Sequence, residues 1–278
     1  MTRTVVTVVS IAGWAIGLTL LYRLRETRFE PGAEGASQSS FWQRLLALVA
    51  RGAGSFVGAL VAGILVMGLG GRLMMRVLAA TSSDDVQGFV TDMDATVGEV
   101  TVDGTIGFIL FIGAGSGLIG WLLRLGFRRW MPQRSIVAGL LGAGIGAGLL
   151  ARGSSLLDPD NHDFAILSPT LLAVVLIVGL IVTFAMLLAV LADVGAQRWP
   201  TPQRPLGVFW LVPLLPMALI PPIALGAGLA VAVRAWFGTI DRYAWSARAD
   251  QIGRAITLTA SAVGAIWTMA AAVEILAN

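Results

Sequence analysis

The sequence contains no cysteine and no lysine, and its single histidine is His162. Without cysteine, the chain has no disulfides, no thiolate nucleophile and no cysteine-ligated zinc or iron–sulfur site. Without lysine, it cannot form the Schiff base on which retinal and pyridoxal chemistry depends. One histidine also excludes a bis-histidine haem. These absences leave few groups for catalysis, so we expect a protein that is not an enzyme and that carries no cofactor and no metal.

Charged residues are also scarce. They make up 13% of the 278 residues, against about 25% in a typical soluble domain. Hydrophobic residues make up 56%, and the mean hydropathy is +0.83. This balance excludes an ordinary soluble enzyme, a disordered tail, a fibrous repeat and a nucleic-acid binder, and it predicts an all-α polytopic membrane protein. All 19 basic residues are arginine, which is typical of a GC-rich genome, so we expect a bacterial plasma membrane with the lipid bilayer as the main partner.

Seven apolar stretches are long enough to matter, given that a helix needs about 20 residues to cross the hydrocarbon core. They are residues 4–22, 54–79, 105–123, 135–151, 169–192, 206–233 and 256–277. Backbone polar groups in lipid must be hydrogen-bonded within their own segment, which favours helices over strands. The sequence therefore predicts a single membrane domain over residues 1–278, built as a bundle of about seven transmembrane helices.

Four prolines interrupt the sixth stretch, at Pro213, Pro216, Pro221 and Pro222. Proline removes a backbone donor and clashes with the preceding helical turn. Two courses therefore remain open for residues 206–233. The stretch crosses once as a kinked helix, or it enters the membrane and returns to the same side, which would place the C-terminus outside.

The arginines predict the orientation of the bundle. With the N-terminus outside, 11 of the 19 arginines fall in inner loops. They are Arg23, Arg25, Arg28, Arg44, Arg51, Arg124, Arg128, Arg129, Arg134, Arg198 and Arg204. Inner loops of membrane proteins carry an excess of positive residues, so we expect this orientation.

Two polar segments separate predicted spans. Residues 81–104 alternate apolar and polar side chains, which predicts a small β-hairpin or irregular loop over the outer mouth of the bundle. Its acidic residues, which either attract cations or form a solvated face, include Asp84, Asp85, Asp92, Asp94, Glu99 and Asp103. Residues 234–254 place Trp236, Ile240 and Tyr243 at helical spacing among charged residues, which predicts an amphipathic helix in the membrane interface.

Arg72 and Arg76 are the strongest candidates for function. They lie near the outer end of the second span, where ionisable residues are costly and often functional. Their spacing of four places both guanidinium groups on one face of a helix. Three interpretations are open: the arginines reach lipid phosphates, they pair with carboxylates of the loop between Asp84 and Asp103, or they face a cavity as an ion or anion site.

Glycine is abundant, with 34 residues, and it often recurs at the spacing that allows helices to approach closely. The fourth span carries Gly142, Gly144, Gly146 and Gly148. This run predicts a helix contact, either within the bundle or between copies of the chain.

Two further expectations concern the ends of spans. Asp193 and Glu274 fall near inner ends, where we expect them to be solvated. Five tryptophans fall at predicted span ends and are expected to form an aromatic belt. They are Trp42, Trp121, Trp130, Trp199 and Trp210.

Together these patterns predict a transporter- or channel-like protein that moves or binds a small ion or an anionic solute. The arginine pair, the proline-broken sixth span and the glycine-rich fourth span support this hypothesis, because discontinuous helices often form ion sites. The alternative is a non-catalytic membrane subunit or scaffold, which would associate with other membrane subunits or with itself.

Overall fold

The computed structural model describes residues 41–82, 88–89, 101–153, 157–158, 160–161, 164, 169–199 and 247–277. This part of the chain is predominantly helical and contains no strand. Five of its helices are long and apolar enough to span a membrane. An all-helical bundle compatible with a membrane protein is therefore confirmed. The predicted spans 4–22 and 206–233 lie outside the described residues.

The first helix of the described part runs without a break from α2 (Phe41–Ala62) through the π-helix η1 (Gly63–Gly70) into α3 (Gly71–Thr81). It contains the predicted span 54–79. Its apolar part covers 32 residues, Ala50–Thr81. At 1.5 Å per residue this part is about 48 Å long, whereas the hydrocarbon core is about 30 Å thick. The helix is therefore long enough to cross the membrane at a steep tilt or to project beyond it.

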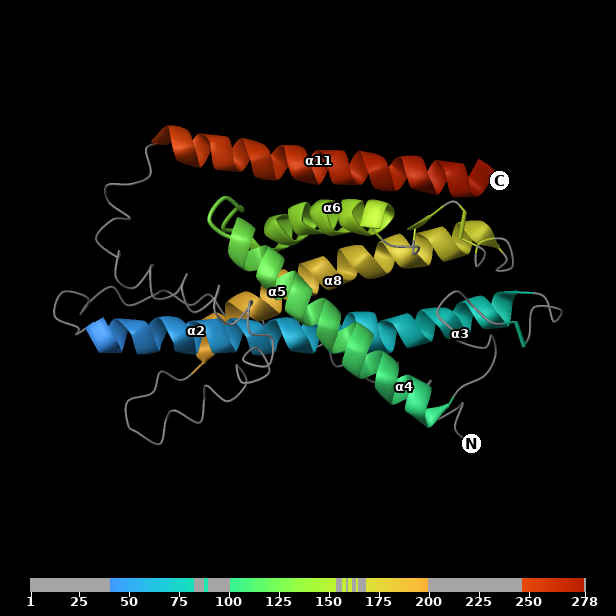
Figure 1. Cartoon of the computed structure of the whole chain (residues 1–278), viewed down its shortest axis with the longest axis horizontal. Helices are drawn as coiled ribbons and strands as arrows, with labels where there is room; N and C mark the ends of the chain where they lie inside the picture. Colours follow the sequence, from blue (N-terminus) through green and yellow to red (C-terminus); the bar gives the residue numbers. More distant parts are fainter. Residues whose placement is uncertain are drawn as a thin grey trace.

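The second helix joins α4 (Val102–Phe108), the π-helix η3 (Ile109–Ala114) and α5 (Gly115–Phe127), and it crosses the first helix obliquely (Figure 1). It begins at Val102 because the Thr101 hydroxyl accepts a hydrogen bond from the Gly104 amide, at 3.1 Å, and caps the first turn. The predicted hairpin over 81–104 is therefore wrong at residues 101–104. Apart from Gly88 and Phe89, the rest of that loop from residue 83 onward, including Asp84, Asp85, Asp92, Asp94 and Glu99, lies outside the described residues.

Three more helices complete the described bundle: α6 (Ser135–Gly153), α8 (Thr170–Arg198) and α11 (Ala247–Ala277). They contain the predicted spans 135–151, 169–192 and 256–277 almost entirely. In Figure 1, α11 lies along α6, α6 lies against α8, and α8 crosses α2. The predicted interfacial helix over 234–254 is wrong for residues 247–254. These residues start α11 and lead into the apolar part without a proline, while residues 234–246 lie outside the described part.

Glycines allow these helices to touch backbone to backbone. A Cβ atom added at Gly54 of α2 would collide with the carbonyl of Gly195 on α8, and the reverse is also true. Gly148 of α6 meets Gly264 of α11 in the same way. Lipid chains are as apolar as leucine, so close van der Waals contact of this kind is a main source of helix association in a membrane.

Trp121 lies in the core and not in an aromatic belt. It is 4% exposed and packs edge-on against Phe56, with 5.2 Å between the ring centroids. Leu187, Leu188 and Leu191 of α8 belong to the same buried cluster. The belt prediction for Trp121 is therefore wrong, because the face of α5 that carries Trp121 packs against α2 and α8.

α6 and α11 run in the same direction. Near one end Arg129, just before α6, pairs with Asp250 in the first turn of α11, with 3.0 Å between Nε and Oδ1. Further along both helices, Gly148 packs against Gly264. The two helices are therefore parallel and end toward the same side of the bundle, with α11 extending beyond α6 (Figure 1).

Two ion pairs show which ends of α8 and α11 lie together. Asp193, near the end of α8, pairs with Arg124 near the end of α5, and the turn that follows α5 carries Arg129, the partner of Asp250. The end of α8 and the start of α11 thus lie at the same end of the bundle.

We therefore expect residue 277 to face the same side of the membrane as residue 82, and the opposite side from residue 133. The chain has no cysteine, so each position can be tested with one introduced thiol: Ser82→Cys, Gln133→Cys and Ala277→Cys. A membrane-impermeant maleimide applied to intact cells should label the first and third variants alike and leave the second unlabelled until the cells are opened. Labelling of Ala277→Cys together with Gln133→Cys would contradict this arrangement.

Candidate functional site

Arg72 stands in the first turn of α3, where it joins this helix to the start of α4. Its Nη2 donates to the carbonyl of Gly104. Its guanidinium also lies over the ring of Phe108, 4.8 Å from the centroid. The Nε atom is buried and has no hydrogen-bond partner among the residues that the structure describes. Arg72 is thus held by a carbonyl and an aromatic face, which orient its charge without neutralising it.

Arg76 lies one turn further along α3, with its Nε and Nη2 atoms buried. The two guanidinium groups are therefore partly withdrawn from solvent on the same stretch of helix. Of the carboxylates that were expected to pair with them, only Asp103 falls within the described chain, and it is exposed in the first turn of α4. The structure thus brings Arg72 to the start of α4, while the other acidic residues lie outside its described part.

The two π-helical segments meet directly before this arginine pair. η1 packs on η3, and a Cβ atom at Gly63 would collide with the backbone of Gly113 and Gly117. π-Helical turns are rare, and they are frequently found at functional sites. Sequence reasoning noted that glycines recur at close-packing spacing but did not single out Gly63, because the wide helical turn leaves no signature in an apolar run.

A second cluster of charges lies at the other end of the bundle, around Asp193. Its Oδ1 is 2.6 Å from Nη2 of Arg124 and 3.6 Å from Nη2 of Arg128. Its Oδ2 accepts a hydrogen bond from the Ser135 hydroxyl at 2.9 Å. The Asp193 side chain is 20% exposed, and that of Arg124 is 7% exposed. The expectation of a freely solvated Asp193 is therefore wrong, because this carboxylate joins α5, α6 and α8.

One signal for this cluster was present in the sequence. Asp193 is the only acidic residue in the 29 residues of α8, and an isolated charge in an apolar helix needs a partner. The partner itself could not be inferred, because several arginines of the neighbouring loop were equally available. Folding selects Arg124, whose side chain points from α5 toward α8.

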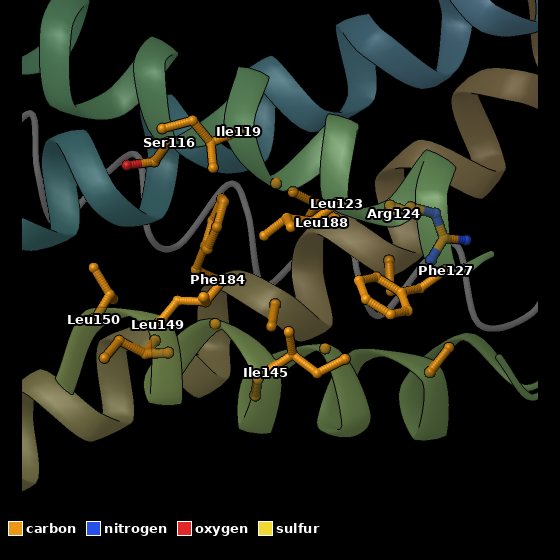
Figure 2. Close-up of a pocket in the computed structure, with 18 of the residues that line it drawn as sticks. Ser116, Ile119, Leu123, Arg124, Phe127, Ile145, Leu149, Leu150, Phe184 and Leu188 are labelled. Carbon is orange, nitrogen blue, oxygen red and sulfur yellow. The ribbon is translucent and has the colours of Figure 1, made fainter. Parts of the chain in front are cut away.

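An apolar groove of about 190 Å³ extends from this cluster along the bundle, between α5 and α6 and against α8. Figure 2 shows Ile119 and Leu123 on one wall, Ile145 and Leu149 on the other, and Phe184 at the base. Arg124 stands at one end beside Phe127. The walls are open to the surroundings, since Ile119 is 61% and Leu149 55% exposed. The groove is therefore apolar along most of its length and cationic at one end.

The glycines of α6 divide between two faces. Gly144 and Gly148 meet the backbone of α11 at Ser261 and Gly264. Gly142 and Gly146 instead line the groove, and a Cβ atom at Gly146 would meet nothing within 4 Å. The run thus serves close packing on one side and leaves room for a ligand on the other.

The described residues contain no group of three or more histidine, aspartate or glutamate side chains that could hold a metal ion. The described residues form an all-helical bundle whose five long apolar helices are compatible with a membrane protein, with two cationic regions, one at each end. Comparisons with models of known protein families, with curated proteins and with solved structures find no match for the chain.

Proposed function

We propose that this chain is a transporter-like membrane protein that binds and moves a small anionic solute at Arg72 and Arg76. The observation that carries the proposal is the position of these arginines immediately after the crossing of η1 and η3. A cationic pair next to two non-α segments within membrane-spanning helices resembles the general design in which discontinuous helices form solute sites.

The charge of Arg72 supports anion binding. Within the described chain its contacts are the neutral carbonyl of Gly104 and the ring of Phe108. A charged group in the hydrocarbon region is costly unless a counter-charge or water reaches it. An anion between Arg72 and Arg76 would supply that counter-charge, and the buried Nε of Arg72 marks unused donor capacity at this place.

The π-helical crossing supports movement. A π-helical turn bonds residue i to i+5, and a return to α-helical bonding would rotate the part that follows it around the helix axis. In the first helix this part is α3, which carries both arginines. Glycine contacts such as that between Gly63 and Gly113 present little side-chain obstruction to such a rotation.

We expect the double variant Arg72→Gln/Arg76→Gln to lower anion flux at least tenfold. The measurement is uptake of radiolabelled chloride and of inorganic phosphate into proteoliposomes. Arg76→Gln alone leaves the Arg72 contacts in place and should also lower the flux. Arg51→Gln is the matched control, since Arg51 is an exposed arginine on the same continuous helix, and it should keep the wild-type rate.

Wild-type flux in the folded double variant would overturn this proposal. Wild-type uptake of both probes no faster than in protein-free vesicles would also overturn it, and would favour a second candidate, a non-catalytic membrane subunit or scaffold. The exposed face of α11 supports that candidate. In the described bundle α11 contacts mainly α6, and Ile256, Ile266 and Met269 are more than half exposed, as the contact face for another membrane protein would be.

A further inference from the structure

We propose that the groove between α5 and α6 binds one acyl chain of an anionic phospholipid, with the lipid phosphate beside Arg124 and Arg128. This site is separate from Arg72 and Arg76, and it does not depend on the transport proposal. Three properties of the groove carry the inference: its length, the charge at its end and the unused donor of Arg124.

The length of the groove fits one leaflet. Along α5 its lining runs from Ser116 to Phe127, a rise of about 16 Å at 1.5 Å per residue. Half of a hydrocarbon core of about 30 Å is about 15 Å. The charged end lies in the last turns of α5 and α8, where we expect each helix to leave the membrane. The groove therefore extends from one membrane surface to about the midplane, which is the depth of a single acyl chain.

The charge at the end of the groove fits a phosphodiester. Arg124 and Arg128 contribute two positive charges and Asp193 contributes one negative charge, so the cluster carries a net charge of +1. The nearby pair of Arg129 and Asp250 is neutral. The Arg128 side chain is 53% exposed, so a headgroup can reach it. A phosphodiester has one negative charge, and guanidinium groups bind phosphate oxygens well.

Arg124 is built into the groove and is not fully used by Asp193. Its side chain is 93% buried, it lines the groove, and its Nε lacks a hydrogen-bond partner in the described bundle. A buried donor without an acceptor is unfavourable, and a phosphate at this end would bring further acceptor oxygens to the guanidinium. Basic pockets between helices on the cytoplasmic side are typical sites for anionic headgroups, and the positive residues predict that this end is cytoplasmic.

An acyl chain also explains why the apolar walls are open. A free anion would use only the end at Arg124, whereas Ile119, Phe184 and Leu149 line most of the length. In a membrane such a groove faces lipid, and an ordered chain within it gains van der Waals contacts that an empty groove lacks. The occupant is therefore an amphiphile, with its charge at one end.

The test is native mass spectrometry of the delipidated full chain with added dioleoyl-phosphatidylglycerol or dioleoyl-phosphatidylcholine. These lipids have the same chains and differ in net charge. We expect phosphatidylglycerol to bind at least tenfold more tightly. Gly146→Phe should fill the groove and weaken its binding at least tenfold, and Gly142→Leu is a second blocking variant, since only Met131 comes within 4.0 Å of an added Cβ. Arg128→Gln should lower the preference for phosphatidylglycerol over phosphatidylcholine.

The matched control is Gly179→Phe. Gly179 is exposed on α8, has nothing within 4 Å of an added Cβ and does not line the groove, so this variant should bind lipid as the wild type does. Equal binding of the two lipids would overturn the proposal, as would tight lipid binding in both folded blocking variants. Competition by inorganic phosphate alone at equal concentration would show a free-anion site instead. Absence of phosphatidylglycerol binding in the wild type would also overturn the proposal.

Discussion

Gly195→Leu is expected to separate α8 from α2 and to cause one of the two largest losses of stability among the single substitutions considered. Gly195 and Gly54 meet backbone to backbone, so even a Cβ atom at either position would collide with the carbonyl of the other. One turn away along α2, a Cβ atom added at Gly58 would likewise collide with the backbone of Leu191. No side-chain rotation can relieve these overlaps, and the two helices would have to move apart along the whole contact.

Overpacking a core by a few methylene groups costs about 1–3 kcal/mol and sometimes more. Here the obstruction is backbone, so we expect a loss of at least about 3 kcal/mol, which corresponds to a fall in Tm of roughly 6–12 °C. Tryptophan fluorescence during heating in mild detergent measures it. Gly179→Leu on the same helix is the control, because Gly179 is exposed and faces open space. Equal Tm values for both variants would contradict the close backbone contact between Gly195 of α8 and Gly54 of α2.

Asp193→Asn is expected to have a comparably large effect on stability. The substitution keeps the size of the side chain and an acceptor for the Ser135 hydroxyl, but it removes the negative charge that faces Arg124 at 2.6 Å. Arg124 would then stay 93% buried as an uncompensated cation. Removing one partner of a buried ion pair typically costs about 3–5 kcal/mol, and Arg128 cannot compensate because it is also a cation.

Two variants make this prediction specific. Arg124→Gln/Asp193→Asn removes both charges, and it should recover a large part of the stability that Asp193→Asn loses. Asp250→Asn breaks the pair with Arg129, whose side chains are 35% and 38% exposed, and exposed pairs contribute only about 0–1 kcal/mol. Thermal unfolding measures the loss of stability in each variant. An equal loss in Asp250→Asn and Asp193→Asn would contradict the prediction, as would a double variant as unstable as Asp193→Asn, because burial of Arg124 would then not determine the loss.

Several elements could be predicted because each depends on a local run of residues. The spans that became α6 and α8 are apolar runs of sufficient length, and lipid requires such runs to satisfy their own backbone groups as helices. The hairpin prediction failed at residues 101–104 because alternation of apolar and polar residues also occurs where a helix begins, and the cap at Thr101 decided between the two. The interfacial helix failed at residues 247–254 because a charged first turn can continue directly into a span.

The candidate sites were only half predictable. Arg72 and Arg76 stand out in the sequence because charges are rare in apolar segments. Their surroundings did not follow, since Gly104 and Phe108 come from a helix about thirty residues further along the chain. The groove had no signature at all, because its walls are ordinary leucine, isoleucine and glycine residues that three helices bring together.

The sequence by itself determined the class of the molecule. Low charge and high hydropathy favour an all-helical bundle suited to a membrane, and the absence of cysteine and lysine excludes chemistry that needs a thiol or an amine side chain, because these are properties of composition and of residues near one another. Only the tertiary structure decided which arginine pairs with Asp193, which glycines of α6 pack and which leave the groove open, and that α11 runs parallel to α6. Those outcomes depend on contacts between residues far apart in the chain, and in a bundle of similar apolar helices many partners are compatible with the same pattern.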